Sequence, residues 1–449
     1  MKRILLAGLA AAALSGCASH TITAPSVRGH MDFMASDAMN GRGSGTRDEW
    51  IAATYIASQL RRWGVEPLGD EGGYVQAVEL ARTQVTAPPV LTAPGLRLTH
   101  GKEMLVQGIA TLRLSGPLEK YQSGAAVTAG AVVLLPEGQV ADLAVMAKAA
   151  AVLTIETPQI RSRWDVQAAR ALSLPARIVA LSSQPAEFIR SFTRVTLDRA
   201  SYAAMTALPP GTIVSMETTG TETTSHTWNA VGRLKGRDPA TADDVILLTA
   251  HLDHIGGNGT GPDPIFNGAD DDASGSTAVL ELCEALAKGK RPKRTIVFAW
   301  FGSEEAGGYG ARYFVERPPV PLERIVANLE FEMIGRADKA VATHTLWLTG
   351  YDRSNLGPEL ARRGARIVAD PHPNQNFFER SDNIVLARRG VIAQTVSSFG
   401  LHTDYHQPSD DLAHVDFAHM TESIQSMLEP VRWLANETFK PVWLPGKRP

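Results

Sequence analysis

Histidines and carboxylates gather in a few short segments of this 449-residue sequence. His251 precedes the aspartate run 270–272, the glutamate pair 304–305 follows, and His406 lies further toward the C-terminus. Imidazole nitrogens and carboxylate oxygens are ligands that suit zinc. Two zinc ions roughly 3.5–4 Å apart can clamp both oxygens of a carbonyl addition, and one carboxylate must then bridge the ions. The sequence therefore predicts a two-zinc hydrolytic site.

Apolar runs that suit buried parallel strands precede the candidate ligands. These runs cover residues 245–250, 295–301, 325–331, 346–349 and 391–396. Helical patterns alternate with them at 276–287, 309–315, 357–363, 382–388 and 421–435. The alternation predicts a three-layer α/β/α sandwich around a mostly parallel central sheet. In such sheets the ligand crevice lies beyond the carboxyl ends of the strands, where these side chains fall.

The chain divides into four expected parts. Residues 1–16 form a signal peptide, 17–86 begin the main domain, 87–213 form an inserted smaller α/β domain, and 214–449 complete the main domain. We expect a tether through Pro25 and an exposed amphipathic helix over 47–60. The insert resembles a protease-associated domain, although it lacks the glycine usual before the second core strand, here 149–155.

The N-terminus predicts export. Lys2 and Arg3 precede an apolar run that is too short to span a membrane, and Leu-Ser-Gly-Cys then ends at Cys17. This resembles a bacterial lipoprotein signal, in which Cys17 becomes the lipidated first residue; an ordinary cleaved signal is the alternative. The resemblance implies a periplasmic location with a lipid anchor, and Ala18 favours the outer membrane. We expect no other membrane contact.

Charge and cysteine content argue against nucleic-acid binding and against an intrachain disulfide. The 44 basic and 47 acidic residues nearly cancel, which disfavours nucleic-acid binding. With Cys17 as an anchor, Cys283 has no partner for an intrachain disulfide. Cys283 shares an apolar helical face with Val279, Leu282 and Leu286, so we interpret it as a core residue.

The motifs resemble metallopeptidase family 28, the di-zinc aminopeptidases, over roughly 42–76 and 229–449. By this resemblance His251 is a zinc ligand that Asp253 orients, and the central Asp271 of Ala-Asp-Asp-Asp-Ala-Ser-Gly bridges the metals. The resemblance also implies that Glu304 is the general base and Glu305 a ligand.

Two assignments near the C-terminal strands need a choice between neighbouring residues, and Tyr405 has two possible roles. Glu332 and Glu330 both precede Met-Ile-Gly, where the family usually has aspartate; alignment favours Glu332 as the ligand, while Glu330 shares its strand face. His406, after Tyr405, is favoured over His402 as the last histidine ligand by the family's Tyr-His pairing. Tyr405 either hydrogen-bonds the developing oxyanion or packs.

Several other polar residues near the motifs are interpreted as supporting groups. They are His254, Ser381, Asp382 and Asp404.

The resemblance implies an exopeptidase, most simply an aminopeptidase that removes N-terminal residues from peptides. Two Zn²⁺ per chain and a metal-bridging hydroxide would supply the nucleophile, with Glu304 moving the protons. Two alternatives remain: a catalytically silent binding protein of the same fold, and a single-zinc acyltransferase of the glutaminyl cyclase type. Oligomeric state and residue preference do not follow from the sequence.

Overall fold

The computed structural model describes residues 21–139, 146–181, 192–257 and 261–449. The chain forms two compact units, Met1–Ala77 with Trp228–Pro449, and Val78–Thr227. Strands β2 (Val75–Val85) and β12 (Gly220–Leu234) contribute residues to both units. The second unit therefore begins before residue 87 and ends after residue 213, the bounds expected for the insert. The predicted signal segment 1–16 and Cys17 lie outside the described residues.

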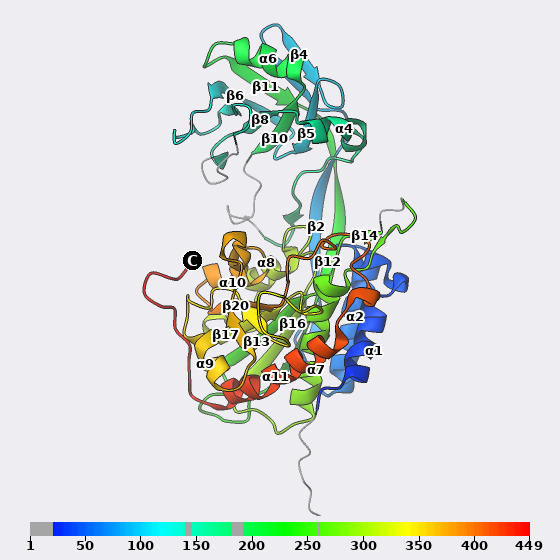
Figure 1. The fold of residues 1–449 in the computed structure, drawn as a ribbon, viewed down its shortest axis with the longest axis vertical. Coiled ribbons are helices and arrows are strands. Elements are labelled where there is room, and N and C mark those ends of the chain that lie inside the picture. The colour runs from blue at the N-terminus through cyan, green and yellow to red at the C-terminus, as the bar shows by residue number, and fades with distance from the viewer. Residues whose placement is uncertain (1–20, 140–145, 182–191, 258–260) are drawn as a thin grey trace, which may run out of the picture. The chain divides into compact units, whose positions relative to one another are not determined.

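A large mixed sheet has the strand order β19-β18-β20-β17-β13-β16-β12-β2-β9, with β1 paired to β12 (Figure 1). The remaining bounds are β1 Glu66–Pro67, β9 Arg177–Ile178, β13 Val245–His251, β16 Thr295–Phe301, β17 Ile325–Phe331, β18 Leu346–Leu348, β19 Ile367–Ala369 and β20 Ala393–Ser397. Strands β16, β13, β17 and β20 run parallel, while β12 and β18 flank them antiparallel. All residues of β13 and β16 are buried, which explains their unbroken apolar runs.

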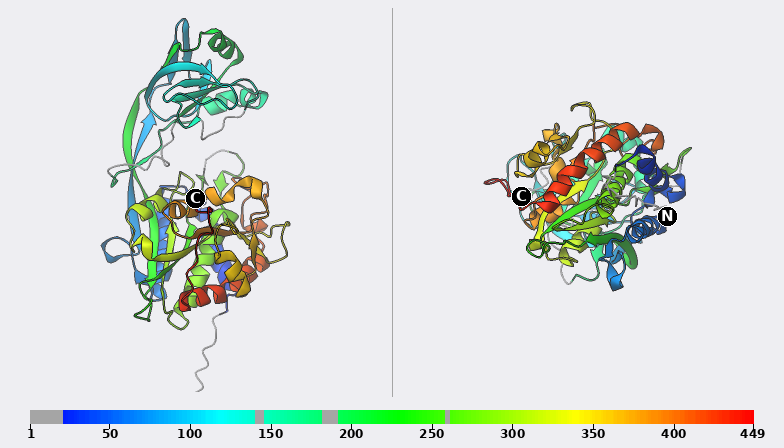
Figure 2. Two further views of the ribbon diagram at one scale, coloured as in Figure 1. Left: turned by 90° about the vertical axis from the view of Figure 1, so that its left-hand side faces the viewer. Right: turned by 90° about the horizontal axis from the view of Figure 1, so that it is seen from below.

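Helices contact both faces of the parallel strands. On one face, α7 (Gly275–Ala287) packs on β13, β16 and β17, and α1 (Ala24–Met34) and α11 (Phe417–Asn436) pack on α7 (Figure 2). On the other, α8 (Tyr309–Glu316) packs on β16 through Phe314 and Phe301, and α10 (Asn383–Arg388) packs on β17 and β20. The other α-helices described in the first unit are α2 (Arg47–Arg62) and α9 (Leu356–Arg362). The expected mixed α/β fold is confirmed, and Cys283 is fully buried in its core.

The tether expected through Pro25 is wrong. Helix α1 begins at Ala24, and Thr23 caps it by accepting a hydrogen bond from the amide of Ser26. Proline is compatible with the first helical turn, where the amides have no intrahelical acceptor. Val27, Met31 and Met34 are fully buried against the main core, so this helix belongs to the first unit.

The Val78–Thr227 unit has its own sheet and core. Its strand order is β4-β3-β11-β6-β7-β8-β10-β5. The bounds are β3 Val90–Ala93, β4 Leu96–Thr99, β5 Met104–Gly108, β6 Arg113–Lys120, β7 Val132–Leu134, β8 Ala151–Ile155, β10 Thr193–Leu197 and β11 Ile213–Glu217, with helices α4 Pro158–Ser162, α5 Trp164–Ala168 and α6 Arg199–Ala207. A separate cluster of buried side chains, including Val132, Leu153 and Val214, fills this unit.

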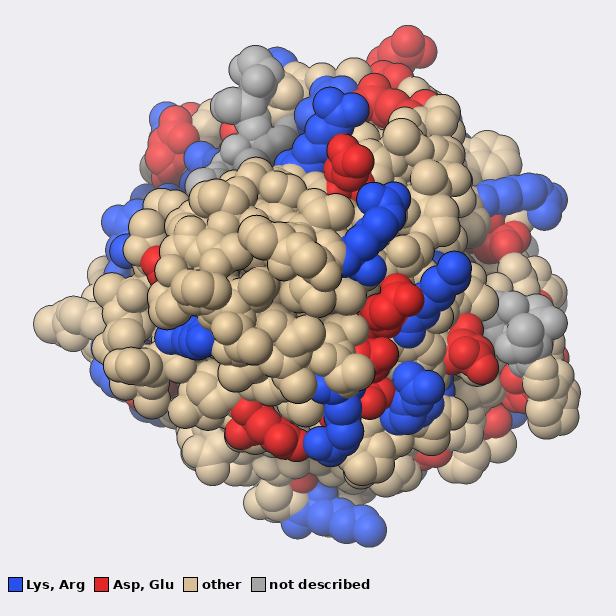
Figure 3. Space-filling view, turned by 90° about the horizontal axis from the view of Figure 1, so that it is seen from above, with Lys and Arg blue, Asp and Glu red and all other residues tan. Residues whose placement is uncertain are grey.

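Basic and acidic side chains lie around a broad uncharged area on the face shown in Figure 3. Among the described residues, no helix combines the length and apolar character needed to cross a membrane.

Candidate metal centre

The carboxyl ends of the parallel strands bring the predicted ligands together. His251 is the last residue of β13, Glu332 follows β17, and the pair 304–305 follows β16 by three residues. The aspartate run lies in the irregular turn Ala269–Ser274 that leads into α7. His406 lies in the loop after β20, with the positive φ of 57°. A non-glycine residue in this conformation is uncommon and is enriched at functional sites.

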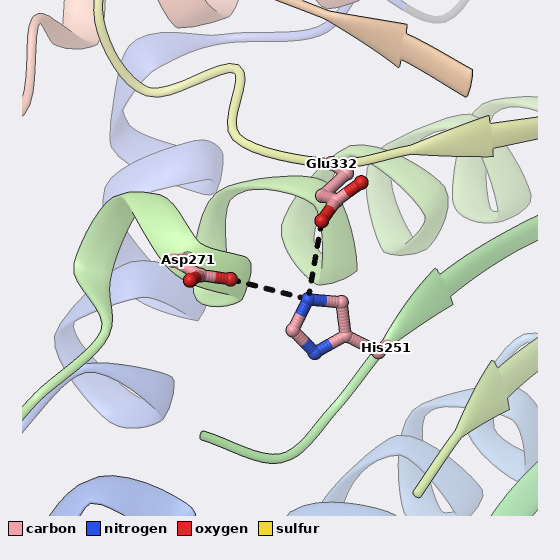
Figure 4. Close-up of side chains that lie close together, drawn as sticks. All are labelled: His251, Asp271 and Glu332. Atoms are coloured by element: carbon pink, nitrogen blue, oxygen red, sulfur yellow. Dashed lines mark ion pairs between the residues drawn. The ribbon is translucent and has the colours of Figure 1, made fainter. Parts of the chain in front are cut away.

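The two carboxylate oxygens of Asp271 face two different groups of residues. Its Oδ1 lies 3.2 Å from His251 Nε2, and the same nitrogen lies 3.9 Å from Glu332 Oε1 (Figure 4). Its Oδ2 lies 3.2 Å from His406 Nε2, which is also 3.2 Å from Glu305 Oε2. A carboxylate arranged in this way can bridge two cations.

His254 joins the second group. Its Nδ1 lies 2.8 Å from Glu305 Oε1 and 3.8 Å from Asp271 Oδ2. His251, Asp271 and Glu332 form one set of potential metal-binding residues, and His254, Asp271 and Glu305 form another. The sequence marked His254 only as a supporting residue, because nothing in its spacing from His251 shows which carboxylate it meets.

The geometry of the donor atoms fits zinc. Within the described part of the chain, His251 Nε2 and His406 Nε2 are buried and have no hydrogen-bond partner, although each lies 3.2 Å from an oxygen of Asp271. Two ligands of one tetrahedral zinc ion, with bonds of about 2.0–2.2 Å, lie roughly 3.3–3.5 Å apart. These atoms are therefore spaced as ligands of a shared ion, and the mixed imidazole and carboxylate set suits zinc.

The carboxylates strongly perturb one another. Burial raises the pKa of Glu332 to about 8, and the nearby charge of Glu330 adds to the shift. Burial also opposes ionisation of Asp271, but the imidazoles of His251 and His406 beside its oxygens outweigh this effect and hold its pKa well below the usual range. For His406, burial favours the neutral ring, yet contacts with Asp271 and Glu305 raise its pKa to about 10. Bound cations would stabilise the ionised carboxylates of this cluster.

The three aspartates of the run have different partners. Asp270 accepts a hydrogen bond from the amide of Gly335, and Asp272 accepts bonds from the amides of Gly275 and Met333. Only Asp271 faces both histidines. The run therefore ties the turn before α7 to the segment after β17, which holds Asp271 at a fixed position between them.

Asp410 fixes the same run from the other side. Its two carboxylate oxygens accept hydrogen bonds from the amides of Asp270 and Asp271, at 3.0 and 3.1 Å. Arg336 donates to both Asp404 and Asp410, which anchors the loop that carries His406. The acceptor role of Asp410 depends on contacts that only the folded chain makes.

The carboxylate of Glu304 lies beside the candidate metal ligands. Among the described residues its carboxylate makes no hydrogen bond or ion pair, whereas its amide donates to Asp253 Oδ1 at 2.9 Å. Burial raises the pKa of Glu304 well above the usual range, and the carboxylates of Asp382, Glu305 and Glu332 add to the shift. A raised pKa suits a group that must accept and then release a proton near neutral pH.

Asp253 holds the turn after β16 as well as facing His251. Its Oδ1 lies 3.7 Å from His251 Nδ1, which is longer than a hydrogen bond. Its oxygens accept hydrogen bonds from the amides of Glu304 and Glu305 and from the hydroxyl of Ser44. Asp253 thus positions Glu304 and Glu305 through their backbone amides, and it faces His251 at a distance that allows interaction through charge.

Glu330 and Glu332 point to different partners. Glu330 is fully buried, and its Oε2 accepts hydrogen bonds from the amide of Asn383 and the hydroxyl of Thr395. Glu332 faces His251 and Asp271, and belongs with them to one potential metal set. The contacts of Glu330 explain why its side chain is held against β20 and α10 instead.

The two C-terminal histidines also differ. His402 Nε2 lies 2.9 Å from Asp270 Oδ2, so it supports the aspartate run, while His406 meets Asp271 and Glu305. Tyr405 stacks on His406 with ring centroids 3.8 Å apart. Burial raises the pKa of the Tyr405 hydroxyl, so it stays protonated at neutral pH.

A pocket opens beside Glu332 and Tyr405. The aromatic rings of Trp347, Phe377 and Phe399 contribute its apolar wall. Trp347 and Phe377 stack at 5.3 Å, and Phe399 meets Phe377 edge-on at 5.8 Å. An apolar group bound there would lie next to the candidate metal ligands.

Arg42 is a buried scaffold residue that the sequence analysis missed. It is fully buried, and its guanidinium donates to the backbone carbonyls of Leu252, Asn267 and Gly268, among others. These carbonyls belong to the segments next to the candidate ligands His251 and Asp271. An arginine between two glycines gives no sign in the sequence that it will be enclosed by distant loops.

Residues 229–431 match the model of peptidase family M28. An aminopeptidase of Pseudomonas aeruginosa strain UCBPP-PA14 is 37% identical over 112 residues, which cover 25% of this chain and 19% of that relative. The chain thus spans about a fifth of the length of this curated relative.

Solved structures with a similar fold include two aminopeptidases. The aminopeptidase from Aneurinibacillus sp. strain AM-1 has a TM-score of 0.58 at 17% identity, with 92% of this chain and 94% of that chain covered. A zinc aminopeptidase from Bacillus subtilis has a TM-score of 0.54 at 18% identity, with 93% and 97% covered. These two structures are similar to this chain in fold. The match to peptidase family M28 concerns residues 229–431, which contain the candidate metal-binding residues.

Proposed function

We propose that this chain is a zinc-dependent aminopeptidase. The main support is the arrangement of the two carboxylate oxygens of Asp271. Its Oδ1 faces His251 and Glu332, while its Oδ2 faces His406 and Glu305. This geometry supports two ions that share one carboxylate. It argues against the single-zinc cyclase alternative, which would need no bridging aspartate.

The proposed reaction is hydrolysis of a peptide bond. Two bound zinc ions would polarise the scissile carbonyl and lower the pKa of a water molecule. Glu304 accepts the proton of the attacking water and then delivers it to the leaving nitrogen. Asp253 keeps Glu304 in position through the backbone amide of that residue. Tyr405, still protonated at neutral pH, is available to donate a hydrogen bond to the developing oxyanion.

The substrate is proposed to be a peptide with a free N-terminus. The relatives named above are aminopeptidases, and the pocket beside Glu332 suits the side chain of a terminal residue. Its wall of Trp347, Phe377 and Phe399 favours apolar side chains. The carboxylates around the site favour a positively charged amine nearby.

We propose that the fold is a three-layer α/β/α sandwich with an inserted domain. The contacts of α7 and of α8 and α10 with the sheet support a three-layer sandwich, and the separate core of Val78–Thr227 supports an inserted domain.

We also propose export and lipid anchoring at Cys17, supported by the signal-like sequence before it. Neither location nor anchor depends on the catalytic proposal.

A panel of reporter peptides tests the activity. Leucyl and glutamyl reporters with free amines, N-acetyl-leucyl reporters and C-terminal reporters are assayed with and without a chelator. We expect chelator-sensitive hydrolysis of free-amine peptides, fastest with the leucyl reporter. Cleavage of the acetylated peptides alone would contradict the aminopeptidase proposal, and no hydrolysis by zinc-loaded protein would favour the silent alternative.

A further inference from the structure

His254 is a buried histidine whose position is fixed on several sides. Its backbone amide donates to the carbonyl of Arg42, and its carbonyl accepts from the amide of Ser44. Its ring lies against Gly268, where an added Cβ would fall 2.5 Å from the imidazole Cγ. The side chain is fully buried, so the ring cannot turn toward solvent.

The contacts of the ring differ from those of His406. His254 Nδ1 forms a hydrogen bond with Glu305 Oε1 at 2.8 Å, and lies 3.8 Å from Asp271 Oδ2. His406 Nε2 lies 3.2 Å from both Glu305 Oε2 and Asp271 Oδ2. Ligands of one tetrahedral zinc ion lie roughly 3.3–3.5 Å apart. The His406 spacing fits a ligand, while the 2.8 Å contact of His254 fits an N–H···O hydrogen bond.

We propose that His254 is a positioning residue that holds Glu305 for the metal. This rests on the proposed zinc pair. The Nδ1–H group of His254 donates to Glu305 Oε1, which leaves Glu305 Oε2 directed toward His406 and Asp271. Without this bond, the Glu305 carboxylate could rotate, and a carboxylate that is free to rotate binds a cation less tightly.

The effect is confined to one of the two ions. His254 contacts Glu305, whereas the group of His251 and Glu332 does not include it. Loss of an outer hydrogen bond to a metal ligand typically costs 10–100-fold in metal affinity. We therefore expect only the ion held by Glu305 and His406 to bind more weakly when the donor is lost.

Two matched substitutions isolate the donor. In His254→Asn, the side-chain amide nitrogen can occupy the place of Nδ1 and donate to Glu305, but in His254→Gln it reaches the place of Nε2. Both residues are polar and uncharged. His254→Leu removes the donor altogether and provides a second donorless variant if one of the others folds poorly.

The experiment measures zinc binding by competition with a chromophoric chelator, without substrate. We expect wild type and His254→Asn to bind two equivalents with similar affinity, while His254→Gln and His254→Leu hold one equivalent 10–100-fold more weakly. The control is His30→Leu, a buried histidine that pairs with Tyr55 and should alter stability but not zinc affinity. Thermal unfolding confirms that each variant is folded.

Two results would overturn the proposal. Equal loss in His254→Asn and His254→Gln would make His254 a direct ligand, and unchanged affinity in His254→Leu would leave it without a role at Glu305. Both outcomes are distinct from failure of the proposed function, which is the absence of two tight zinc equivalents or of peptidase activity in the wild-type protein.

Discussion

The Oδ1 atom of Asp271 lies 3.2 Å from the Nε2 atom of His251, while the second oxygen of Asp271 faces the opposite way, toward His406. One side chain is thus shared by both proposed ions. Asp271→Asn should therefore reduce bound zinc from two equivalents to fewer than one, as measured by elemental analysis after dialysis. Asp352→Asn, an exposed aspartate paired with Lys447, is the control. Retention of one tight equivalent would show that Asp271 serves a single ion.

Replacement of Glu304 separates catalysis from metal binding. Glu304→Gln keeps the size of the side chain but cannot accept the proton of water. We expect two zinc equivalents and a 10²–10⁴-fold lower kcat, the usual contribution of general acid–base catalysis. Glu379→Gln, on the exposed surface, should leave kcat unchanged. Near-normal turnover in Glu304→Gln would remove this residue from the mechanism.

The glutamates after β17 should respond differently to substitution. Glu332→Gln removes the negative charge from a side chain that faces His251, so the ion near His251 should bind more weakly in chelator competition. Glu330→Gln alters a residue that already accepts hydrogen bonds from Asn383 and Thr395, and should keep both equivalents. The reverse pattern would assign the ligand role to Glu330.

Stability should depend on pH through Glu281. Burial raises its pKa from an ordinary 4.5 to about 7, so the folded chain holds a proton that the unfolded chain has released. Stability therefore falls as pH rises from 4.5 to 7, by roughly 3 kcal/mol.

Glu281→Gln removes this dependence. It should match wild type near pH 4 and exceed it by up to that amount at pH 8, measured by chemical denaturation. The exposed control Glu323→Gln should follow the wild-type profile. A Glu281→Gln curve parallel to wild type over pH 5–8 would show that this carboxyl does not titrate during folding.

The two cysteines allow a direct test of lipid anchoring. In a bacterial host fed labelled palmitate, we expect the wild-type chain and Cys283→Ala to carry label in the membrane fraction. Cys17→Ala should be unlabelled and released by osmotic shock. If Cys17→Ala carried as much label as the wild-type chain, the lipid would be attached at another residue.

The sequence predicted β13 and β16 closely because every residue of these two strands is buried. An unbroken apolar run such as 295–301 is required when both faces of a strand avoid water, and β16 has those bounds. The amphipathic helix expected over 47–60 likewise appears as α2, which extends to Arg62. Helix α1 was missed because Pro25 indicates an irregular segment unless the capping contact of Thr23 is known.

The sequence by itself indicated which histidines and carboxylates are candidate zinc ligands, because few kinds of side chain can bind zinc. Tertiary structure decided which neighbours meet. The separation of Glu330 from Glu332, the contact of His254 with Glu305, and the enclosure of Arg42 by carbonyls of distant segments all depend on how loops from different strands converge. These contacts join residues from separate segments of the chain, so no local pattern could specify them.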